Sequence, residues 1–222
     1  TGEVHLYKMR NDTLIKIKEI IRKGSGPLDG GNQGIEIYTL DDGGIVIGAS
    51  GYNPKTFHLS AANRSFIKDL QMWELNEIPT KVFVNKFLPI DRSRYLIQVT
   101  GDIPSLLAYY ELGDTAFTYI PFPYPDDKYS DFTRTMAYSG IMKKRPFKEQ
   151  YLYHTVGGKY LFTFTLNKSK EMNNINYIYN KPKEFKLQKD GIGLGNMTDE
   201  TPIHSYVYCT QNYIYEIGRA HV

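Results

Sequence analysis

The chain has 222 residues and a formal net charge of +3; 41% of its residues are hydrophobic and 14% are aromatic. A compact chain of this length can bury roughly 70% of the surface that it exposes when unfolded, so a sizeable core is feasible. Lysine and arginine are scattered without a basic stripe, which argues against a nucleic-acid partner. The single cysteine, Cys209, excludes an internal disulfide framework, and the apolar runs are too short to predict a transmembrane segment.

The first predicted elements are strands separated by glycine-rich segments. Leu14–Ile21 is a strand candidate with alternating lysines. Arg22–Gly34 is predicted to be a connecting loop because it is rich in glycine and contains a proline, and it lacks the spacing of a phosphate-binding loop. Strands at 35–40 and 44–49 are predicted to pair across a two-residue turn at Asp42-Gly43. This pairing would place four side chains on one face of the hairpin: Tyr38, Leu40, Ile45 and Ile47.

Further short strands continue to the end of the chain. They are predicted at 56–59, 65–70, 81–90, 95–99, 106–112, 115–120, 135–142, 151–156, 159–166, 173–179, 204–209 and 213–216. Pro121–Ser130 contains three prolines and is predicted to be a linker, and Lys181–Pro202 is predicted to be a long polar loop. A turn at Gly113-Asp114 would pair the two strands that flank it, so that alternate side chains of both strands share one face. That face holds Ala108, Tyr110, Leu112, Phe117 and Tyr119.

The most informative stretch is Tyr151–Leu166, which is predicted to form a hairpin around Gly157-Gly158. A two-residue turn pairs Tyr153 with Phe162 and Tyr151 with Phe164. Because side chains alternate along a strand, one face of the hairpin is aromatic. That face holds Tyr151, Tyr153, Tyr160, Phe162 and Phe164. Such a face can be buried only against another sheet.

Four-stranded units of this kind recur every ~50 residues, which is the spacing of propeller blades. The predicted fold class is therefore all-β: an incomplete β-propeller of four-stranded antiparallel blades, with about three and a half blades. No segment has helical periodicity long enough to compete. A β-sandwich is the structural alternative, although sandwich strands do not usually fall into regular groups of four.

Short hydrophobic motifs are spread over nearly the whole chain. They are Ile15–Pro27 (IKIKEIIRKGSGP), Phe83–Pro89 (FVNKFLP), Ala137–Gly140 (AYSG) and Tyr213–Tyr215 (YIY). Together they resemble the TolB-like six-bladed β-propellers of gut and oral Bacteroidota. The resemblance implies an extracytoplasmic protein, in the periplasm or at the cell surface, with a lipid anchor in its full-length form. The family has no agreed catalytic residues, so none is carried over.

Six blades need roughly 300 residues at about 50 per blade, so we expect this chain to be a fragment of a longer propeller. Its last residues, Ile217–Val222 (IGRAHV), match the translation of a common sequencing adapter. We therefore assign residues 1–216 to a partial β-propeller domain and residues 217–222 to a non-native tail. The first and last blades should each expose an apolar lateral face.

No metal site, cofactor site or catalytic constellation is predicted. The candidates for metal ligands lack metal-binding spacing; they are His154, His204, Cys209, and the acidic group Asp126, Asp127 and Asp131. Gly191–Gly195 lacks the strand and helix that a dinucleotide fingerprint requires. Asp12-Thr13-Leu14 and Asp114-Thr115-Ala116 fit a short O-glycosylation pattern used by Bacteroidota.

Two functions remain open at this point. The first is a non-catalytic binding or scaffolding propeller of the bacterial cell envelope, with an unknown protein, peptide or glycan as its ligand and binding residues that the sequence leaves unassigned. The second is a propeller enzyme, a lyase or hydrolase, with its site in the central channel. The 19 tyrosines are consistent with a sugar or peptide surface, but most of them occupy alternating strand positions that are typical of packing between blades.

Overall fold

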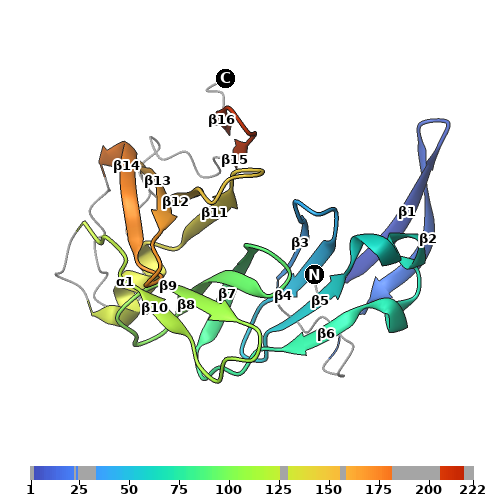
Figure 1. The fold of residues 1–222 in the computed structure, drawn as a ribbon, viewed down its shortest axis with the longest axis horizontal. Coiled ribbons are helices and arrows are strands. Elements are labelled where there is room, and N and C mark those ends of the chain that lie inside the picture. The colour runs from blue at the N-terminus through green and yellow to red at the C-terminus, as the bar shows by residue number, and fades with distance from the viewer. Residues whose placement is uncertain are drawn as a thin grey trace, which may run out of the picture. The chain divides into compact units, whose positions relative to one another are not determined.

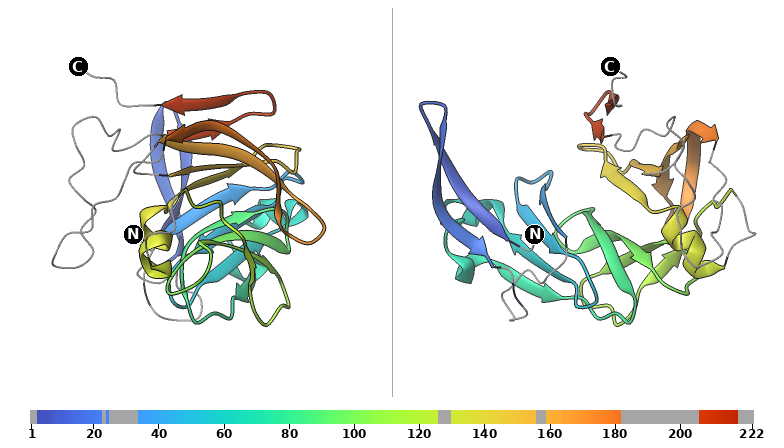
Figure 2. Two further views of the ribbon diagram at one scale, coloured as in Figure 1. Left: turned by 90° about the vertical axis from the view of Figure 1, so that its left-hand side faces the viewer. Right: turned by 180° about the vertical axis from the view of Figure 1, so that it is seen from behind.

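A computed structural model describes residues 3–22, 24, 34–125, 130–155, 159–181 and 206–217 (Figures 1 and 2). Of these residues, 53% lie in strands and 9% in helices, so the predicted all-β class is confirmed. The chain divides into two compact units. One comprises Thr1–Val99 with Tyr110–Phe117, and the other comprises Thr100–Tyr109 with Thr118–Val222.

The strands form antiparallel sheets whose spatial order follows the chain. The first four-stranded sheet contains β3 (Ile35–Thr39), β4 (Ile45–Ala49), β5 (Lys55–Leu59) and β6 (Glu74–Glu77). The second contains β7 (Phe83–Pro89), β8 (Arg94–Thr100), β9 (Leu107–Glu111) and β10 (Thr118–Ile120). The third contains β11 (Gly140–Lys144), β12 (Tyr151–Thr155), β13 (Lys159–Leu166) and β14 (Met172–Lys181).

Two further sheets have two strands each: β1 (Val4–Arg10) with β2 (Thr13–Ile21), and β15 (Tyr206–Cys209) with β16 (Ile214–Ile217). Four-stranded antiparallel meanders that follow one another along the chain are the blades of a β-propeller. The fold is therefore propeller-like, with three whole blades and two half-blades among the described residues. The β1 strand is not among the sequence predictions.

The registers of two predicted hairpins are confirmed. Tyr151 pairs with Phe164 and Tyr153 with Phe162 across β12 and β13, although the predicted Gly157-Gly158 turn lies outside the described residues. In the second sheet, Thr118 pairs with Tyr109, as the Gly113-Asp114 turn predicts. In both hairpins a short connection and strict alternation leave only one register that buries the apolar face.

The register predicted at Asp42-Gly43 is wrong by one residue. Thr39 pairs with Ile45, and the Leu40 N–H donates to the Gly44 carbonyl at 2.8 Å. The loop therefore has three residues, and Gly43 ends it with φ at +85°, a conformation that glycine adopts without strain. Tyr38 consequently pairs with Val46 and does not share a face with Ile45.

Two predicted strands are also wrong. Residues 65–70 do not form a strand, because the chain makes 3₁₀ turns at η1 (Ala61–Phe66) and η2 (Leu70–Met72) before β6 begins. The buried Trp73 fixes this detour, since its indole packs on the core of β4 and β5. Residues 135–142 do not form one strand either: α1 (Asp131–Ala137) precedes β11. Polar capping overrides strand propensity there, because the Ser130 side chain accepts a hydrogen bond from the Thr133 N–H.

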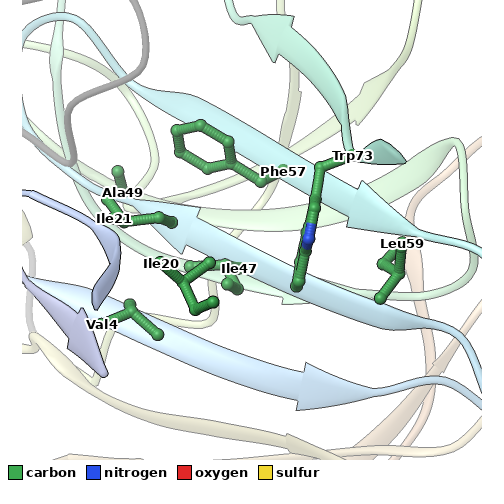
Figure 3. Packing of buried hydrophobic residues seen from close by; sticks show 8 residues of the cluster. All are labelled: Val4, Ile20, Ile21, Ile47, Ala49, Phe57, Leu59 and Trp73. Carbon is green, nitrogen blue, oxygen red and sulfur yellow. The ribbon is translucent and has the colours of Figure 1, made fainter. Parts of the chain in front are cut away.

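The core of the first unit is a layer between sheets. Val4, Ile20 and Ile21 of β1 and β2 pack against Ile47 of β4 and Phe57 of β5 (Figure 3). These side chains are almost fully buried. The β1–β2 hairpin thus covers one face of the β3–β6 sheet, as a neighbouring blade does, while its far end extends beyond that sheet (Figure 2).

The core of the second unit is aromatic. Phe162 lies within ring-contact distance of five other rings, which belong to Phe122, Tyr153, Tyr160, Phe164 and Tyr177. Buried hydroxyls are satisfied by loop carbonyls: the Tyr153 hydroxyl donates to the Tyr138 carbonyl at 2.5 Å, and that of Tyr160 donates to the Pro123 carbonyl. The aromatic face predicted for this hairpin is therefore buried against the linker and the segment after α1.

Candidate functional site

A candidate binding site lies around α1, in the connection between β10 and β11. Ser130 caps the helix, and Asp131 follows in the first turn, where the helix dipole favours a negative charge. In an antiparallel meander, the β8–β9 loop and the connection after β10 lie at the same end of the sheet. The α1 helix therefore belongs to a cluster of loops, the usual location of binding residues.

Thr135 fixes the helix to the β8–β9 loop. It is fully buried, and its Oγ1 accepts a hydrogen bond from the Gly101 N–H at 3.3 Å. The same hydroxyl lies 3.1 Å from the Gly101 carbonyl oxygen and 2.9 Å from that of Phe132, either of which can accept its proton. The helix is thus held to the loop by a buried polar contact.

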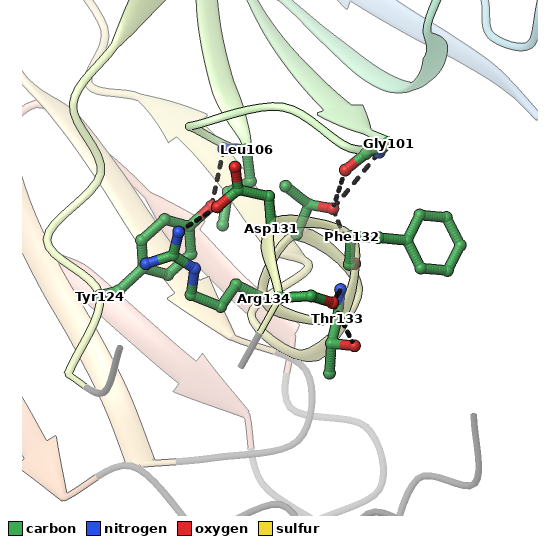
Figure 4. A network of polar contacts seen from close by, with 9 residues as sticks. Gly101, Leu106, Tyr124, Asp131, Phe132, Thr133 and Arg134 are labelled. Atoms are coloured by element: carbon green, nitrogen blue, oxygen red, sulfur yellow. Dashed lines mark hydrogen bonds and ion pairs between the residues drawn. The ribbon is translucent and has the colours of Figure 1, made fainter. Parts of the chain in front are cut away.

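Arg134 is held between a carboxylate and an aromatic ring (Figure 4). Its Nη2 makes an ion pair with Asp131 Oδ1, and its guanidinium carbon lies 4.9 Å from the centroid of the Tyr124 ring. The Tyr124 hydroxyl accepts a hydrogen bond from the Leu106 N–H at 2.9 Å, and burial raises the pKa of Tyr124. The Arg134 side chain keeps 20% of its surface exposed, and the neighbouring Phe132 keeps 38%.

This arrangement has a defined chemistry. A pre-oriented guanidinium recognises planar acceptors such as carboxylates, and it also bonds to sugar hydroxyls. An exposed phenyl ring offers a stacking surface for a sugar or an apolar side chain. Arg134 and Phe132 point to different sides of the helix (Figure 4), so they are suited to binding as two separate contacts.

A second polar cluster lies in the first unit, on β5 and β6. The His58 ring is only 1% exposed, its Nδ1 lies 3.5 Å from Glu74 Oε2, and neither ring nitrogen makes a hydrogen bond. Glu74 also pairs with Arg92 from the β7–β8 turn. Burial lowers the pKa of His58 below its usual value of 6.5, and Arg92 adds to this, whereas the charges of Glu74 and Asp42 act in the opposite direction.

We expect His58 to make the fold sensitive to mild acid. In the unfolded chain His58 takes up a proton near pH 6.5, whereas the folded chain resists protonation, so the free energy of unfolding should fall as the pH drops from about 6.5 to 5. Urea unfolding measured across this range should show a flatter dependence for His58→Gln. Glu74→Gln should steepen it, because the Glu74 charge favours the protonated ring. An unchanged slope in His58→Gln would rule out this assignment.

The residues considered as metal ligands are not brought together. His154 is buried in β12, and Cys209 is buried in β15, where burial raises the pKa of its thiol. Asp131 pairs with Arg134. His204, Asp126, Asp127, Gly191–Gly195 and residues 218–222 lie outside the described residues. Across the part of the chain that the structure describes, no three His, Cys, Asp or Glu side chains are grouped as metal ligands.

Other sequence candidates are placed at the surface. Thr13 and Thr115 are both exposed, the former at the start of β2 and the latter next to the Gly113 turn. Ile217 ends β16 and pairs with Tyr206 through its backbone. Within the described ranges, no helix is long and apolar enough to cross a membrane.

The sequence reasoning did not find the α1 site or the His58 cluster. The one readable signal was Ser130-Asp131, a typical helix start, although the prolines just before it favoured a linker. Comparison with known proteins yields no matching family model and no matching curated relative. The function is therefore argued from the fold and from the chemistry of these residues.

Proposed function

We propose that the chain belongs to a non-catalytic binding or scaffolding propeller of the bacterial cell envelope, with a protein, peptide or glycan as its ligand. The observation that carries this proposal is the α1 site. A short helix is inserted between two blades and fixed by Thr135 and Ser130, and it holds Arg134 and Phe132 at a loop surface. Rigid support of a few exposed side chains is what binding sites require.

The side chains at α1 indicate which ligand groups the site can bind. A guanidinium already oriented by Asp131 and Tyr124 loses little side-chain freedom when it binds. A ligand that offers a carboxylate or vicinal hydroxyls would engage Arg134, and one that offers an apolar or sugar face would stack on Phe132, on the other side of the helix (Figure 4). Acidic glycans and peptides that carry both acidic and apolar residues offer both kinds of group.

The test is a binding screen on glycan and peptide arrays, followed by calorimetry on the hits. Phe132→Ala and Arg134→Gln should each weaken a specific hit by tenfold or more, since anchor residues at a binding site cost over about 1.4 kcal/mol when truncated. Phe66→Ala is the matched control, because Phe66 is also an exposed phenylalanine, 50% against 38% for Phe132, and lies in the other unit. If both α1 variants bind a hit as tightly as the unaltered chain does, the binding site lies elsewhere.

An enzyme assay distinguishes the non-catalytic proposal from the alternative, a lyase or hydrolase with a central-channel site. The full-length protein would be screened against polysaccharide and lactone substrates. Turnover that is abolished by one channel substitution would refute the non-catalytic proposal. Binding at α1 without turnover on any substrate supports it.

We also propose membership of the TolB-like six-bladed propellers and an extracytoplasmic location with a lipid anchor. Both rest on the short motifs, of which Phe83–Pro89 forms β7 and Tyr213–Tyr215 enters β16. The full-length gene decides the location: a signal peptide with a lipidation site is expected, and its absence would contradict the proposal.

A further inference from the structure

The turn between β11 and β12 exposes a phenyl ring. Phe147 is 69% exposed, whereas Tyr151, which begins β12 four residues later, is buried in the aromatic core. The Phe147 backbone has φ at +58°, in the left-handed region that a bulky side chain rarely adopts. The exposed ring and the disfavoured φ both cost the fold free energy, and strain of this kind collects at functional sites.

The turn is braced on both sides of Phe147. The Arg145 N–H donates to the Gln150 carbonyl at 2.9 Å, and the Lys148 N–H donates to the Arg145 carbonyl at 3.2 Å. The Arg145 guanidinium donates to the Gln150 side chain at 2.6 Å and to the Gln211 carbonyl at 2.8 Å. The phenyl ring is therefore presented to solvent by a loop whose own contacts hold it in place.

Positive charge gathers around this ring at one end of the β11–β14 sheet. In an antiparallel meander, the β11–β12 and β13–β14 turns lie at the same end (Figure 2, left). Residues 144–150 and 167–171 hold five cations and two carboxylates: Lys144, Arg145, Lys148, Lys168 and Lys170, against Glu149 and Glu171. This surplus of three positive charges equals the net charge of +3 of the whole chain.

These cations are available to a partner. Lys148 and Lys168 are exposed. The partners of Arg145 are uncharged, and the Lys170 Nζ lies 4.3 Å from the centroid of the Tyr109 ring. The end of the sheet therefore combines an exposed apolar ring with a positive surface, and its complement is a negative surface with an apolar layer behind it.

We propose that this end of the β11–β14 sheet docks on an anionic lipid bilayer, with Phe147 inserted among the headgroups. Anionic headgroups attract clustered lysines, and the boundary with the acyl chains accepts a phenyl ring. A peptide binds in a groove or along a strand edge, whereas these residues lie on the tips of turns. The α1 helix precedes β11, at the opposite end of the sheet, so the docked chain keeps the α1 site accessible.

Vesicle flotation tests this docking, with the chain produced without an attached lipid. Vesicles made of equal parts of phosphatidylcholine and phosphatidylglycerol should carry the chain upward, and pure phosphatidylcholine vesicles should not. Added sodium chloride should weaken the binding, because salt screens exposed charges. Lys148→Gln and Lys168→Gln should each reduce partitioning about fivefold. Lys81→Gln, an exposed lysine in the other unit, should have no effect.

Phe147→Asn separates a membrane role from a structural one. Asparagine adopts positive φ more readily than phenylalanine, so this variant should be at least as resistant to urea as the unaltered chain. Its partitioning should nevertheless fall about tenfold, because the inserted ring is lost. The control is Tyr52→Ala: Tyr52 is 68% exposed in the other unit, and partitioning should not change.

Phe147→Trp reports insertion directly. Brominated lipid should quench the fluorescence of the new indole, while the buried Trp73 stays unquenched. Docking would be overturned by equal binding to both kinds of vesicle or to neither, by partitioning that the Phe147 and lysine substitutions leave unchanged, or by an indole that brominated lipid does not quench. It would also be overturned if an acidic polysaccharide bound through these lysines while vesicles did not float the chain.

Discussion

Replacing Gly140 by alanine should severely destabilise the β11–β14 sheet. Gly140 begins β11 and pairs with Thr155 of β12. An ideal Cβ at this position would lie 2.2 Å from the His154 carbonyl oxygen and 3.0 Å from Cε1 of Tyr153. The first of these atoms belongs to the backbone of the adjacent strand, so it cannot rotate away. The strands must separate, and we expect a loss of about 3 kcal/mol or more in the free energy of unfolding.

Urea unfolding followed by circular dichroism measures this loss, with Ser139→Ala as the control. Ser139 is adjacent in the chain and partly exposed, so its replacement should change stability by less than about 0.5 kcal/mol. If Gly140→Ala were as stable as the control, the close pairing of β11 with β12 would be incorrect.

The sequence was sufficient for most strands and for two registers because these depend on local rules. At Tyr151–Leu166 and around Gly113-Asp114, alternation and a short connection act together, and a slip by one residue would turn every aromatic side chain to the wrong face. The β15–β16 hairpin was found in the same way, from alternating apolar residues on both sides of a polar turn.

The sequence predictions that failed also have identifiable physical causes. At Asp42-Gly43 two loops differ by one residue, and the choice depends on whether Gly43 ends the turn with positive φ, which composition does not reveal. At 61–72 the chain is shaped by the buried Trp73, a tertiary contact. At α1 a seven-residue helix is too short to show a helical period, and its cap is the main sequence signal.

The candidate site was beyond sequence reasoning for a different reason. Arg134, Tyr124 and Leu106 come from three separate segments, and their contacts exist only because the β8–β9 loop and the connection after β10 lie at one end of the β7–β10 sheet. His58 was inconspicuous as a lone histidine on a strand; only the register with Glu74 across β5 and β6 gives it a charged neighbour.

Truncating Phe162 to alanine should remove the centre of the aromatic core in the second unit. Phe162 is fully buried on β13, stacked on Tyr153 at 5.6 Å between ring centroids, and in contact with Phe122 of the linker. The cavity would lie between the β12–β13 hairpin and the linker. The neighbouring Tyr153 and Tyr160 rings of the hairpin are held by their hydroxyl bonds to the Tyr138 and Pro123 carbonyls, so they cannot easily collapse into it. We expect a loss of about 3–5 kcal/mol in the free energy of unfolding.

Phe66→Ala is the matched control here too, because Phe66 is half exposed on η1 and its removal leaves no cavity. Near-ultraviolet circular dichroism separates the two outcomes further, since Phe162→Ala should also weaken the tyrosine signal as the surrounding rings lose their fixed orientation. Phe162→Leu should recover part of the stability, because it refills most of the volume without restoring ring contacts. A Phe162→Ala protein with full stability and an unchanged tyrosine signal would mean that the linker does not pack on this face.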